Sequence, residues 1–491
     1  MVAALWLLAP TSMYADGGKR EFRGAWMQFV NGMYLGKSTA EIQQMLTHQL
    51  DELEKDGANA IIFQVRGECD ALYESKIEPW SRYLTGVQGK APSPYWDPMA
   101  WMIQQCHRRG MEFHAWINPY RARMKSPTRL ADNHILKTHP ERAFEYGGLY
   151  VLNPGLKENR DYILSVVDDI VGRYDIDGIH IDDYFYPYPE GGRPIPDDRE
   201  YALYNNGIAD RGDWRRYNVN LFVKEMGEHV HKLKPWVKFG VSPFGIYRNK
   251  KSSPIGSDTN GLQNYDQLYA DVLLWVNNGW IDYCVPQLYW NIGHPLADYE
   301  KLIKWWAKHM ANRPLYIGES IENTVQNSDP ANPNTHQMAA KFSLHRQLRN
   351  VSGTVLWYAK VAAEDMGSYG TMLRNVYWKS KALPPYMPFL DSKAPKKPAK
   401  MGDTWTEDGL MLYWSAPKAK KWGDEARRYV IYRFAKGEKV NLADASKIVE
   451  ITYDNYYRLP YNGGTDKYTY VVTALDRVGN ESKGAKRKVK L

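Results

Sequence analysis

The chain has 491 residues, 44% of them hydrophobic, and neither Pro nor Gly is in excess, which indicates a globular protein and excludes a disordered or fibrous one. Its net charge of +8 resides in residues 391–491, where 21 Lys and Arg stand against 13 Asp and Glu. The preceding residues carry balanced charge, which excludes a nucleic-acid-binding footprint on the larger part of the chain. The basic C-terminal part is either a solvated face or a contact with a cell-wall or membrane surface.

The sequence begins MVAALWLLAPTSMYADGG. Its apolar run at 2–10 is too short to span a bilayer. The run is typical of a signal peptide, with small residues suited to cleavage near Ala15. A frayed N-terminal segment is the alternative. We therefore expect residues 1–18 to be a signal-peptide remnant or disordered, and the protein to be exported to the periplasm or cell envelope.

From residue 21 onward, apolar runs alternate with amphipathic stretches. The predicted strands are 21–28, 59–66, 112–119, 178–185, 238–245, 282–290, 314–321 and 353–360. The predicted helices are 39–57, 97–110, 158–175, 213–234, 265–279, 295–310, 334–350 and 364–378. Near-continuous apolar strands are typical of parallel sheets covered by helices. Eight such units predict an α/β fold, a (β/α)8 TIM barrel over residues 19–385. A doubly wound open sheet is the alternative, but a Gly-rich phosphate turn is missing.

The rest of the chain has a different pattern. Residues 386–400 are rich in Pro and Lys, as in a linker. Residues 401–491 alternate polar and apolar side chains in short runs separated by turns. This period of two, together with Trp414 and the Tyr-rich run at 468–476, predicts a small all-β sandwich that resembles the fibronectin type III domain.

Polar and aromatic residues follow the predicted strands at their carboxyl ends, where barrel enzymes carry their active sites. The candidate catalytic carboxylates are Asp182, Glu319 and Asp183. The candidate substrate-binding residues are His180, Arg66, Gln64, Glu68, His114, Trp116, Asn118, Tyr120, Ser242, Gln287, Tyr289, Trp290, Trp357 and Tyr358. With 18 Trp and 36 Tyr, aromatic side chains are available both for the core and for stacking on sugar rings. We expect no metal and no organic cofactor, and three buried free cysteines.

The stretch DGIHIDDYFYP (177–187) carries the central prediction. Glycoside hydrolysis requires two carboxylates beside the scissile bond. Strand alternation turns His180 and Asp182 toward the barrel lumen and the neighbouring Ile residues toward the helices. Asp182 is therefore the first-choice nucleophile or base. Its partner acid is predicted to be Glu319 first and Glu68 second. Asp183, which sits where the strand ends, either supports Asp182 or acts itself.

Several segments, in order, resemble one family: EFRGAWM, QVRGECDALY, HAWINPYR, DGIHIDDYFYP, SPFGIYR and PQLYW. They are similar to the bacterial glycosyl hydrolase-like family ten, whose members are exported or lipid-anchored (β/α)8 proteins. The resemblance implies a glycosidase of the cell envelope. Its members look like enzymes that cut peptidoglycan glycan strands, particularly strands stripped of stem peptides. DGIHID also resembles, more loosely, the strand-4 pattern of the α-amylase group, which implies Asp182 as nucleophile.

Residues and resemblance together predict an exported glycoside hydrolase whose substrate is a glycan, peptidoglycan strands first. One alternative is a non-catalytic carbohydrate-binding protein of the envelope. The other is a glycosidase that acts on an external polysaccharide. Oligosaccharide products distinguish an enzyme from a binding protein.

Overall fold

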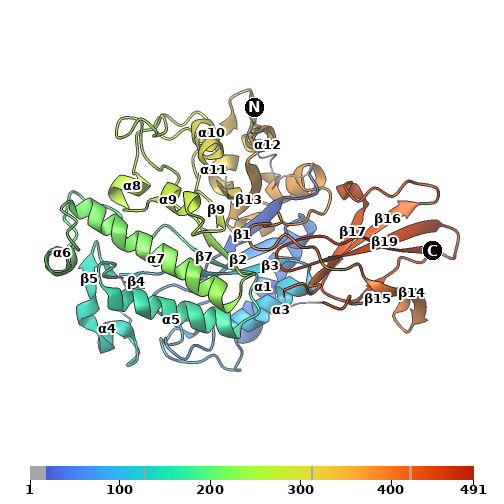
Figure 1. The fold of residues 1–491 in the computed structure, drawn as a ribbon, viewed down its shortest axis with the longest axis horizontal. Coiled ribbons are helices and arrows are strands. Elements are labelled where there is room, and N and C mark those ends of the chain that lie inside the picture. The colour runs from blue at the N-terminus through green and yellow to red at the C-terminus, as the bar shows by residue number, and fades with distance from the viewer. Residues whose placement is uncertain (1–17, 126–127, 311–312, 420–422) are drawn as a thin grey trace, which may run out of the picture.

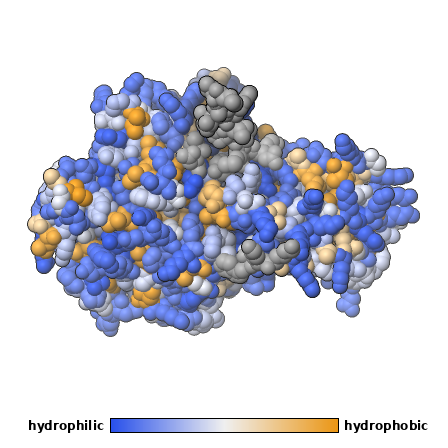
Figure 2. All heavy atoms as spheres, viewed as in Figure 1, coloured by the Kyte–Doolittle hydropathy of each residue, from blue (hydrophilic) through white to orange (hydrophobic). Residues whose placement is uncertain are grey.

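The computed structural model describes residues 18–125, 128–310, 313–419 and 423–491. The predicted signal segment lies outside these ranges except for its last residue. Over the described ranges, no helix combines the length and the apolar character needed to cross a membrane. The face shown in Figure 2 is largely hydrophilic, and its hydrophobic residues form small separate groups.

In the described part of the chain, eight parallel strands close into a barrel in the order β1-β13-β10-β9-β8-β7-β3-β2 (Figure 1). Their bounds are β1 (Phe22–Met27), β2 (Ala60–Arg66), β3 (Glu112–Ile117), β7 (Gly178–Ile181), β8 (Lys238–Val241), β9 (Tyr283–Cys284), β10 (Leu315–Ser320) and β13 (Val351–Trp357). Around the barrel, each strand lies next to the barrel strand that precedes or follows it in the sequence, and β1 pairs with β13 to close the ring. The predicted (β/α)8 barrel is confirmed, and the open-sheet alternative is excluded.

Helices cover the outside of the barrel (Figure 1). Their bounds are α1 (Thr39–Lys55), α2 (Arg82–Thr85), α3 (Pro98–Arg108), α4 (Ile135–Thr138), α5 (Lys157–Arg173), α6 (Asp198–Tyr204), α7 (Arg211–Leu233), α8 (Asn264–Gln267), α9 (Val272–Asn277), α10 (Tyr299–His309), α11 (Ile321–Gln326), α12 (Met338–Gln347), α13 (Ala359–Ala363) and α14 (Tyr369–Met372). Local sequence explains α1: Ser38 and Glu41 form a capping box, and Leu46 and Leu50 lie on its buried face.

Two loop regions add strands outside the barrel. The loop after β3 folds into a small antiparallel sheet of β4 (Arg121–Arg123), β5 (Ala143–Tyr146) and β6 (Leu149–Leu152). A hairpin of β11 (Ser328–Asp329) and β12 (Asn332–His336) occupies the start of the helix predicted at 334–350. That helix therefore begins only at Met338, since Asn and Pro in this segment favour a turn.

Alternation sorts the barrel strands into two layers. Inward-facing Phe22, Trp26, Tyr283 and Tyr316 belong to a cluster that fills the lumen, whereas residues of opposite parity pack on the helices. Gly240 on β8 leaves room for this filling, because a Cβ there would lie 1.9 Å from the Tyr283 ring. The lumen is thus a packed core, and any site must lie at an end of the barrel.

The C-terminal part forms two antiparallel sheets. One contains β14 (Ala399–Thr406), β15 (Gly409–Ser415) and β18 (Tyr456–Arg458); the other contains β17 (Ile448–Thr452), β16 (Arg428–Ala435), β19 (Lys467–Leu475) and β20 (Ala485–Lys490). Leu412 and Trp414 of the first sheet share a buried cluster with Ile431 and Val472 of the second. This is a two-sheet sandwich, and its resemblance to fibronectin type III stays a prediction.

The C-terminal sheets pack on the end of the barrel where its strands begin. Arg428 Nη2 lies 2.7 Å from Glu112 Oε1, at the first residue of β3. The Tyr453 ring stacks on His107 at a centroid distance of 4.4 Å. Gly110 also lies against the C-terminal sheets, since a Cβ built on it would be only 2.2 Å from the Ile451 carbonyl oxygen. The backbones of the two parts are therefore in direct contact here. The carboxyl ends of the strands, called the rim below, lie at the opposite end.

Candidate active site

Asp182 lies at the rim, directly after β7, and residues of the adjacent strand hold it. Trp116 Nε1 donates to its carboxylate at 3.0 Å, and Asn118 Nδ2 lies 3.2 Å from both of its oxygens. The strand register explains this contact. Trp116 of β3 pairs with His180 of β7, so Asn118 and Asp182, each two residues further on, lie at the same level. Asp182 therefore lies on the lumen side, as the alternation predicts.

Asp183 is buried at the same rim, with different partners. Gln287 Nε2, from the segment after β9, donates to Asp183 Oδ1 at 3.0 Å and to the Ser242 carbonyl at 2.9 Å. The Tyr188 hydroxyl donates to the other carboxylate oxygen. Because β7 ends at Ile181, strand alternation no longer separates the two aspartates. Both are buried, with exposures of 4% and 2%.

Their surroundings raise the pKa of both carboxyl groups. Burial raises the pKa of Asp182 to about 7, the Asp183 charge adds to the rise, and Arg121 opposes it. Burial also raises the pKa of Asp183, against the hydrogen bonds from Tyr188 and Gln287. The rim thus holds two buried carboxyl groups that keep their protons to a higher pH than exposed aspartates do.

Aromatic side chains line the rim beside the aspartates. Tyr289 and Trp357 are half-buried and stack at 6.0 Å between ring centroids. Trp26 lies edge-on to both, at 6.4 and 6.1 Å, and Trp116 meets Trp357 at 6.3 Å. Tyr289 and Trp357 are flat, partly exposed rings that suit sugar binding, whereas Trp26 and Trp116 are buried, with exposures of 2% and 6%. Of the other predicted aromatics, Trp290 and Tyr358 are half-buried, and Trp290 lies edge-on to Phe244.

Four predicted substrate-binding residues lie beneath the aspartates, inside the barrel. His114, His180 and Ser242 are at most 2% exposed; both histidines bond to the Tyr283 hydroxyl, and His180 also bonds to Ser242 Oγ. Gln64 is also buried, and its side-chain oxygen accepts a hydrogen bond from the Phe29 N–H at 3.1 Å. These side chains form the floor of the site and are shielded from solvent.

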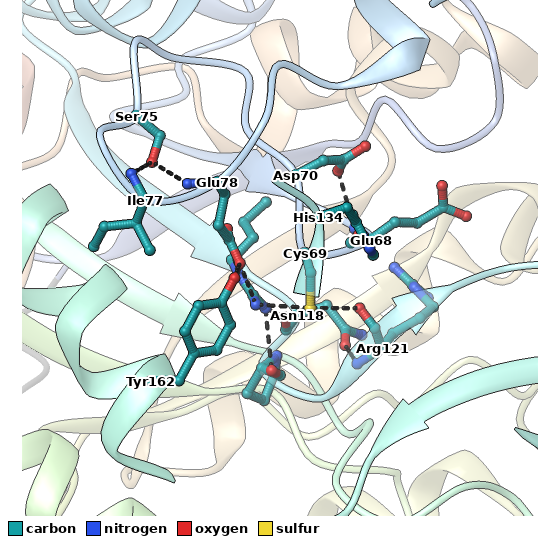
Figure 3. Close-up of polar contacts among 12 residues, drawn as sticks. Glu68, Cys69, Asp70, Ser75, Ile77, Glu78, Asn118, Arg121, His134 and Tyr162 are labelled. Carbon is teal, nitrogen blue, oxygen red and sulfur yellow. Dashed lines mark hydrogen bonds and ion pairs between the residues drawn. The ribbon is translucent and has the colours of Figure 1, made fainter. Parts of the chain in front are cut away.

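Three other predictions need correction, because the side chains serve the structure of the loops. Arg66 is fully buried in a bidentate ion pair with Glu78. Glu78 Oε1 also accepts from the Tyr162 hydroxyl (Figure 3). A register shift between Gln64 and Arg66 turns Arg66 away from the lumen. The Glu68 carboxylate accepts from Arg82 and the Met124 N–H. Figure 3 shows Glu68 beside Asp70, whose carboxylate accepts from the Glu68 N–H. Tyr120 packs edge-on against Phe222 of α7.

Glu319 is also not brought to the aspartates. It lies on the outer face of β10, where Lys341 Nζ of α12 approaches its Oε1 to 2.6 Å and the Thr324 hydroxyl donates to it. Gly318 is the inward residue at this level, since a Cβ there would lie 3.0 Å from the Trp26 ring. The next residue must then point to the helices. Glu319 is a buried structural ion pair, and this corrects its prediction as the catalytic partner.

Arg121, Tyr188 and Trp26 were not among the predicted site residues. Trp26 could have been found, because Phe22, Gly24 and Trp26 share one strand face. Arg121 begins β4 and Tyr188 lies in the loop after β7, and no local pattern showed where these segments would carry them. Arg121 is 8% exposed, and its Nε donates to the Gly67 carbonyl at 2.9 Å.

No group of three or more His, Cys, Asp or Glu side chains that could hold a metal ion occurs among the described residues. Cys69, Cys106 and Cys284 are buried and free. The chemistry that the rim itself offers is proton transfer by carboxyl groups.

Comparisons with known proteins identify a family and several similar proteins. Residues 21–334 match the family model described as Glycosyl hydrolase-like 10. Glycosyl hydrolase YngK of Bacillus subtilis (strain 168) is 39% identical over 483 residues, covering 96% of this chain and 94% of YngK. Glycosyl hydrolase DigH of Escherichia coli O6:H1 (strain CFT073) is 37% identical over 332 residues, covering 64% and 75%. The solved glycoside hydrolase domain of PgaB (BpsB) from Bordetella bronchiseptica aligns with a TM-score of 0.48 at 11% identity, covering 72% and 98%.

Proposed function

Since this chain belongs to the Glycosyl hydrolase-like 10 family and is a glycoside hydrolase, we propose that it cleaves peptidoglycan glycan strands with Asp182 and Asp183. The raised pKa of Asp182 changes the role expected from the sequence, where it was the nucleophile or base. Asp182 is the general acid: its carboxyl group donates a proton to the glycosidic oxygen as the bond from that oxygen to the anomeric carbon breaks. Asp183 is the carboxylate that either attacks the anomeric carbon or takes a proton from the attacking water.

The observation that carries this assignment is the pair of adjacent buried carboxyl groups at the rim, each oriented by hydrogen bonds from neighbouring strands or loops. Burial and the Asp183 charge hold the pKa of Asp182 at about 7, so Asp182 is largely protonated below neutral pH. Its close donors, Trp116 and Asn118, are neutral and fix its direction without supplying a countercharge. One proton on a pair of carboxyl groups is what an acid and a base acting together require.

The substrate and location are further parts of the proposal. The partly exposed rings of Tyr289 and Trp357, which pack on the buried Trp26 and Trp116, suit stacking on sugar rings. Uncharged rings favour the glycan itself over charged stem peptides, which supports strands without stem peptides as the substrate. The apolar run at 2–10 supports export to the periplasm or cell envelope.

The test is incubation of the purified protein with three substrates: peptide-free glycan strands, intact peptidoglycan and a polysaccharide without amino sugars. Mass spectrometry of the products is expected to show oligosaccharides from the peptide-free strands. Cleavage of the third substrate alone would overturn the proposed substrate. The anomeric configuration of the first product decides whether Asp183 attacks the sugar or activates water.

Matched variants test the residues. Asp182→Asn and Asp183→Asn are each expected to lose activity, whereas Asp266→Asn, which removes an ion pair with Arg248, keeps it. Near-normal turnover by Asp182→Asn on the cleaved substrate would show that another group is the acid.

A further inference from the structure

A chain of buried hydrogen bonds runs along the lumen of the barrel from the C-terminal sheets to the floor of the site. It joins, in order, Arg428, Glu112, His114, Tyr283, His180 and Ser242. Each member is at most 2% exposed. The members come from β16, β3, β9, β7 and the segment after β8, so only the closed barrel brings them together.

The lower end of the chain carries its charges. Arg428 Nη2 donates to Glu112 Oε1 at 2.7 Å, and Lys238 Nζ lies 2.6 Å from the same oxygen. The other carboxylate oxygen lies 3.2 Å from His114 Nε2. Although burial alone would raise the pKa of Glu112, Lys238 and Arg428 lower it to about 2. Glu112 is therefore an ionised carboxylate that only accepts hydrogen bonds.

The upper part of the chain is neutral. His114 Nδ1 lies 2.8 Å from the Tyr283 hydroxyl, which lies 3.1 Å from His180 Nδ1. His180 Nε2 lies 2.9 Å from Ser242 Oγ. Burial lowers the pKa of both histidines and raises that of Tyr283. Each imidazole therefore carries one proton, and the phenol keeps its own.

These facts leave one arrangement of protons. His114 must donate from Nε2 to the Glu112 carboxylate, so its Nδ1 accepts. The Tyr283 hydroxyl must then donate to His114 Nδ1, and its oxygen accepts from His180 Nδ1–H. His180 Nε2 is left without a proton, and Ser242 Oγ–H donates to it. A single charge at the bottom of the barrel thus determines the direction of every hydrogen bond up to Ser242.

We propose that Glu112, held by Lys238 and by Arg428 of the C-terminal sheets, is a positioning residue that fixes the tautomers of His114 and His180 and so orients Ser242 beneath the active carboxyl groups. Ser242 is connected to the active site, because its carbonyl accepts from Gln287 Nε2 and the same Nε2 donates to Asp183. The position of Ser242 therefore affects a donor of Asp183. The C-terminal sheets are then part of the working barrel. The effect on catalysis rests on the proposed function of the rim; the proton positions do not.

The first test reads the proton positions in the full chain labelled with 15N-histidine. Long-range 1H–15N correlations at pH 7 are expected to show His114 protonated on Nε2 and His180 on Nδ1, with assignments from the His114→Gln and His180→Asn variants. The reverse tautomers, or a charged imidazolium at either residue, would overturn the proposal. Expected tautomers in a protein that cleaves no glycan would instead count against the proposed function.

Tyr283→Phe breaks the chain in the middle and leaves all charges in place. We expect His114 to keep its proton on Nε2, while His180 populates both tautomers. The kcat is expected to fall about 5- to 10-fold, the size of one net buried hydrogen bond, with little change in KM. The control is Tyr34→Phe, whose buried hydroxyl lies outside the lumen and has no hydrogen-bond partner among the described residues. A single His180 tautomer with unchanged kcat in Tyr283→Phe would overturn the positioning role.

A second variant tests whether the order originates at Glu112. The double change Glu112→Gln and Lys238→Met removes one charge of each sign, so the net charge of the cluster is unchanged and Arg428 stays as its buried cation. Because an amide both donates and accepts, His114 is expected to lose its single tautomer. If both histidines kept their tautomers, Glu112 would not set the direction of the chain.

Discussion

The two ends of the barrel bury their carboxyl groups equally well and shift them in opposite directions. At the rim, burial raises the pKa of Asp182 to about 7. At the end covered by the C-terminal sheets, Lys238 and Arg428 outweigh burial and lower the pKa of Glu112 to about 2. Asp177, which lies 2.8 Å from His107, is likewise shifted downward.

The difference lies in the partners. The close donors of Asp182 are an indole and an amide, whereas those of Glu112 include two full positive charges. Neutral donors fix a carboxyl group in space and leave its proton available, while cations hold it permanently ionised. One end of the barrel is therefore suited to proton transfer and the other to holding two parts of the chain together.

The largest expected effect separates the rim from the outer face of the barrel. Asp182→Asn is expected to lower kcat on peptide-free strands by about 10²- to 10⁴-fold, because the general acid is lost. Glu319→Gln is expected to keep kcat but to lower the free energy of unfolding by about 3–5 kcal/mol, because Lys341 loses its buried partner. Kinetics and urea unfolding of both variants check this. Equal losses of kcat would remove the distinction between the two sites.

The next effect concerns the covered end. Arg428→Met removes one cation from the buried Glu112 cluster and is expected to cost about 3–5 kcal/mol of unfolding free energy. The matched control is Arg487→Met, which removes a partly exposed pair with Asp403 and is expected to cost less than about 1 kcal/mol. Chemical denaturation measures both. Similar costs would mean that the contact between sheets and barrel is not held by this charge.

A smaller effect is the pH dependence of stability, which has opposite signs at the two ends. The raised pKa of Asp182 means that its ionisation opposes folding, so the protein loses stability as pH rises from about 4 to 7. Asp182→Asn removes this loss and is expected to gain about 1–2 kcal/mol at pH 7 and little at pH 4. The lowered pKa of Glu112 stabilises the fold above about pH 4.5, and this contribution is lost as pH falls toward 2. Urea unfolding at a series of pH values measures both contributions. If Asp182→Asn were less stable than the unchanged protein at pH 7, the destabilising effect assigned to Asp182 would be wrong.

The smallest effect sharpens the electrostatics of the rim. Arg121 lowers the pKa of Asp182, so Arg121→Gln is expected to raise that pKa. The fall of kcat/KM on the alkaline side, set by the loss of the Asp182 proton, then moves up by about 0.5–1 pH unit. The control is Arg123→Gln in the same small sheet, which bonds to the Thr128 carbonyl. A downward shift in Arg121→Gln would contradict the assignment of Asp182 as the acid.

The order of the barrel could be predicted from the sequence because each strand is a local apolar run. The expected strand at 282–290 is the clearest shortfall. Only Tyr283–Cys284 forms a regular ladder, since Pro286 has no N–H to donate. The site was less predictable. The inward direction of Asp182 was predicted from the alternation of side chains along one strand. The same rule applied to β10 would have predicted that Glu319 points outward. The bulge that redirects Arg66 had no comparable signal.

The fold class, the division of the chain into two parts and the position of Asp182 could all be derived from the sequence, because apolar periodicity and strand alternation act within a few residues. The protonation of the carboxyl groups could not, since it depends on the folded chain. The proton occupancy of each carboxyl group depends on charges from distant segments, such as that of Arg428 beside Glu112, and on neutral donors, such as Gln287 beside Asp183. Electrostatic interactions at 3 Å in a buried site outweigh every local preference, and the distance between such groups is set only when the barrel closes.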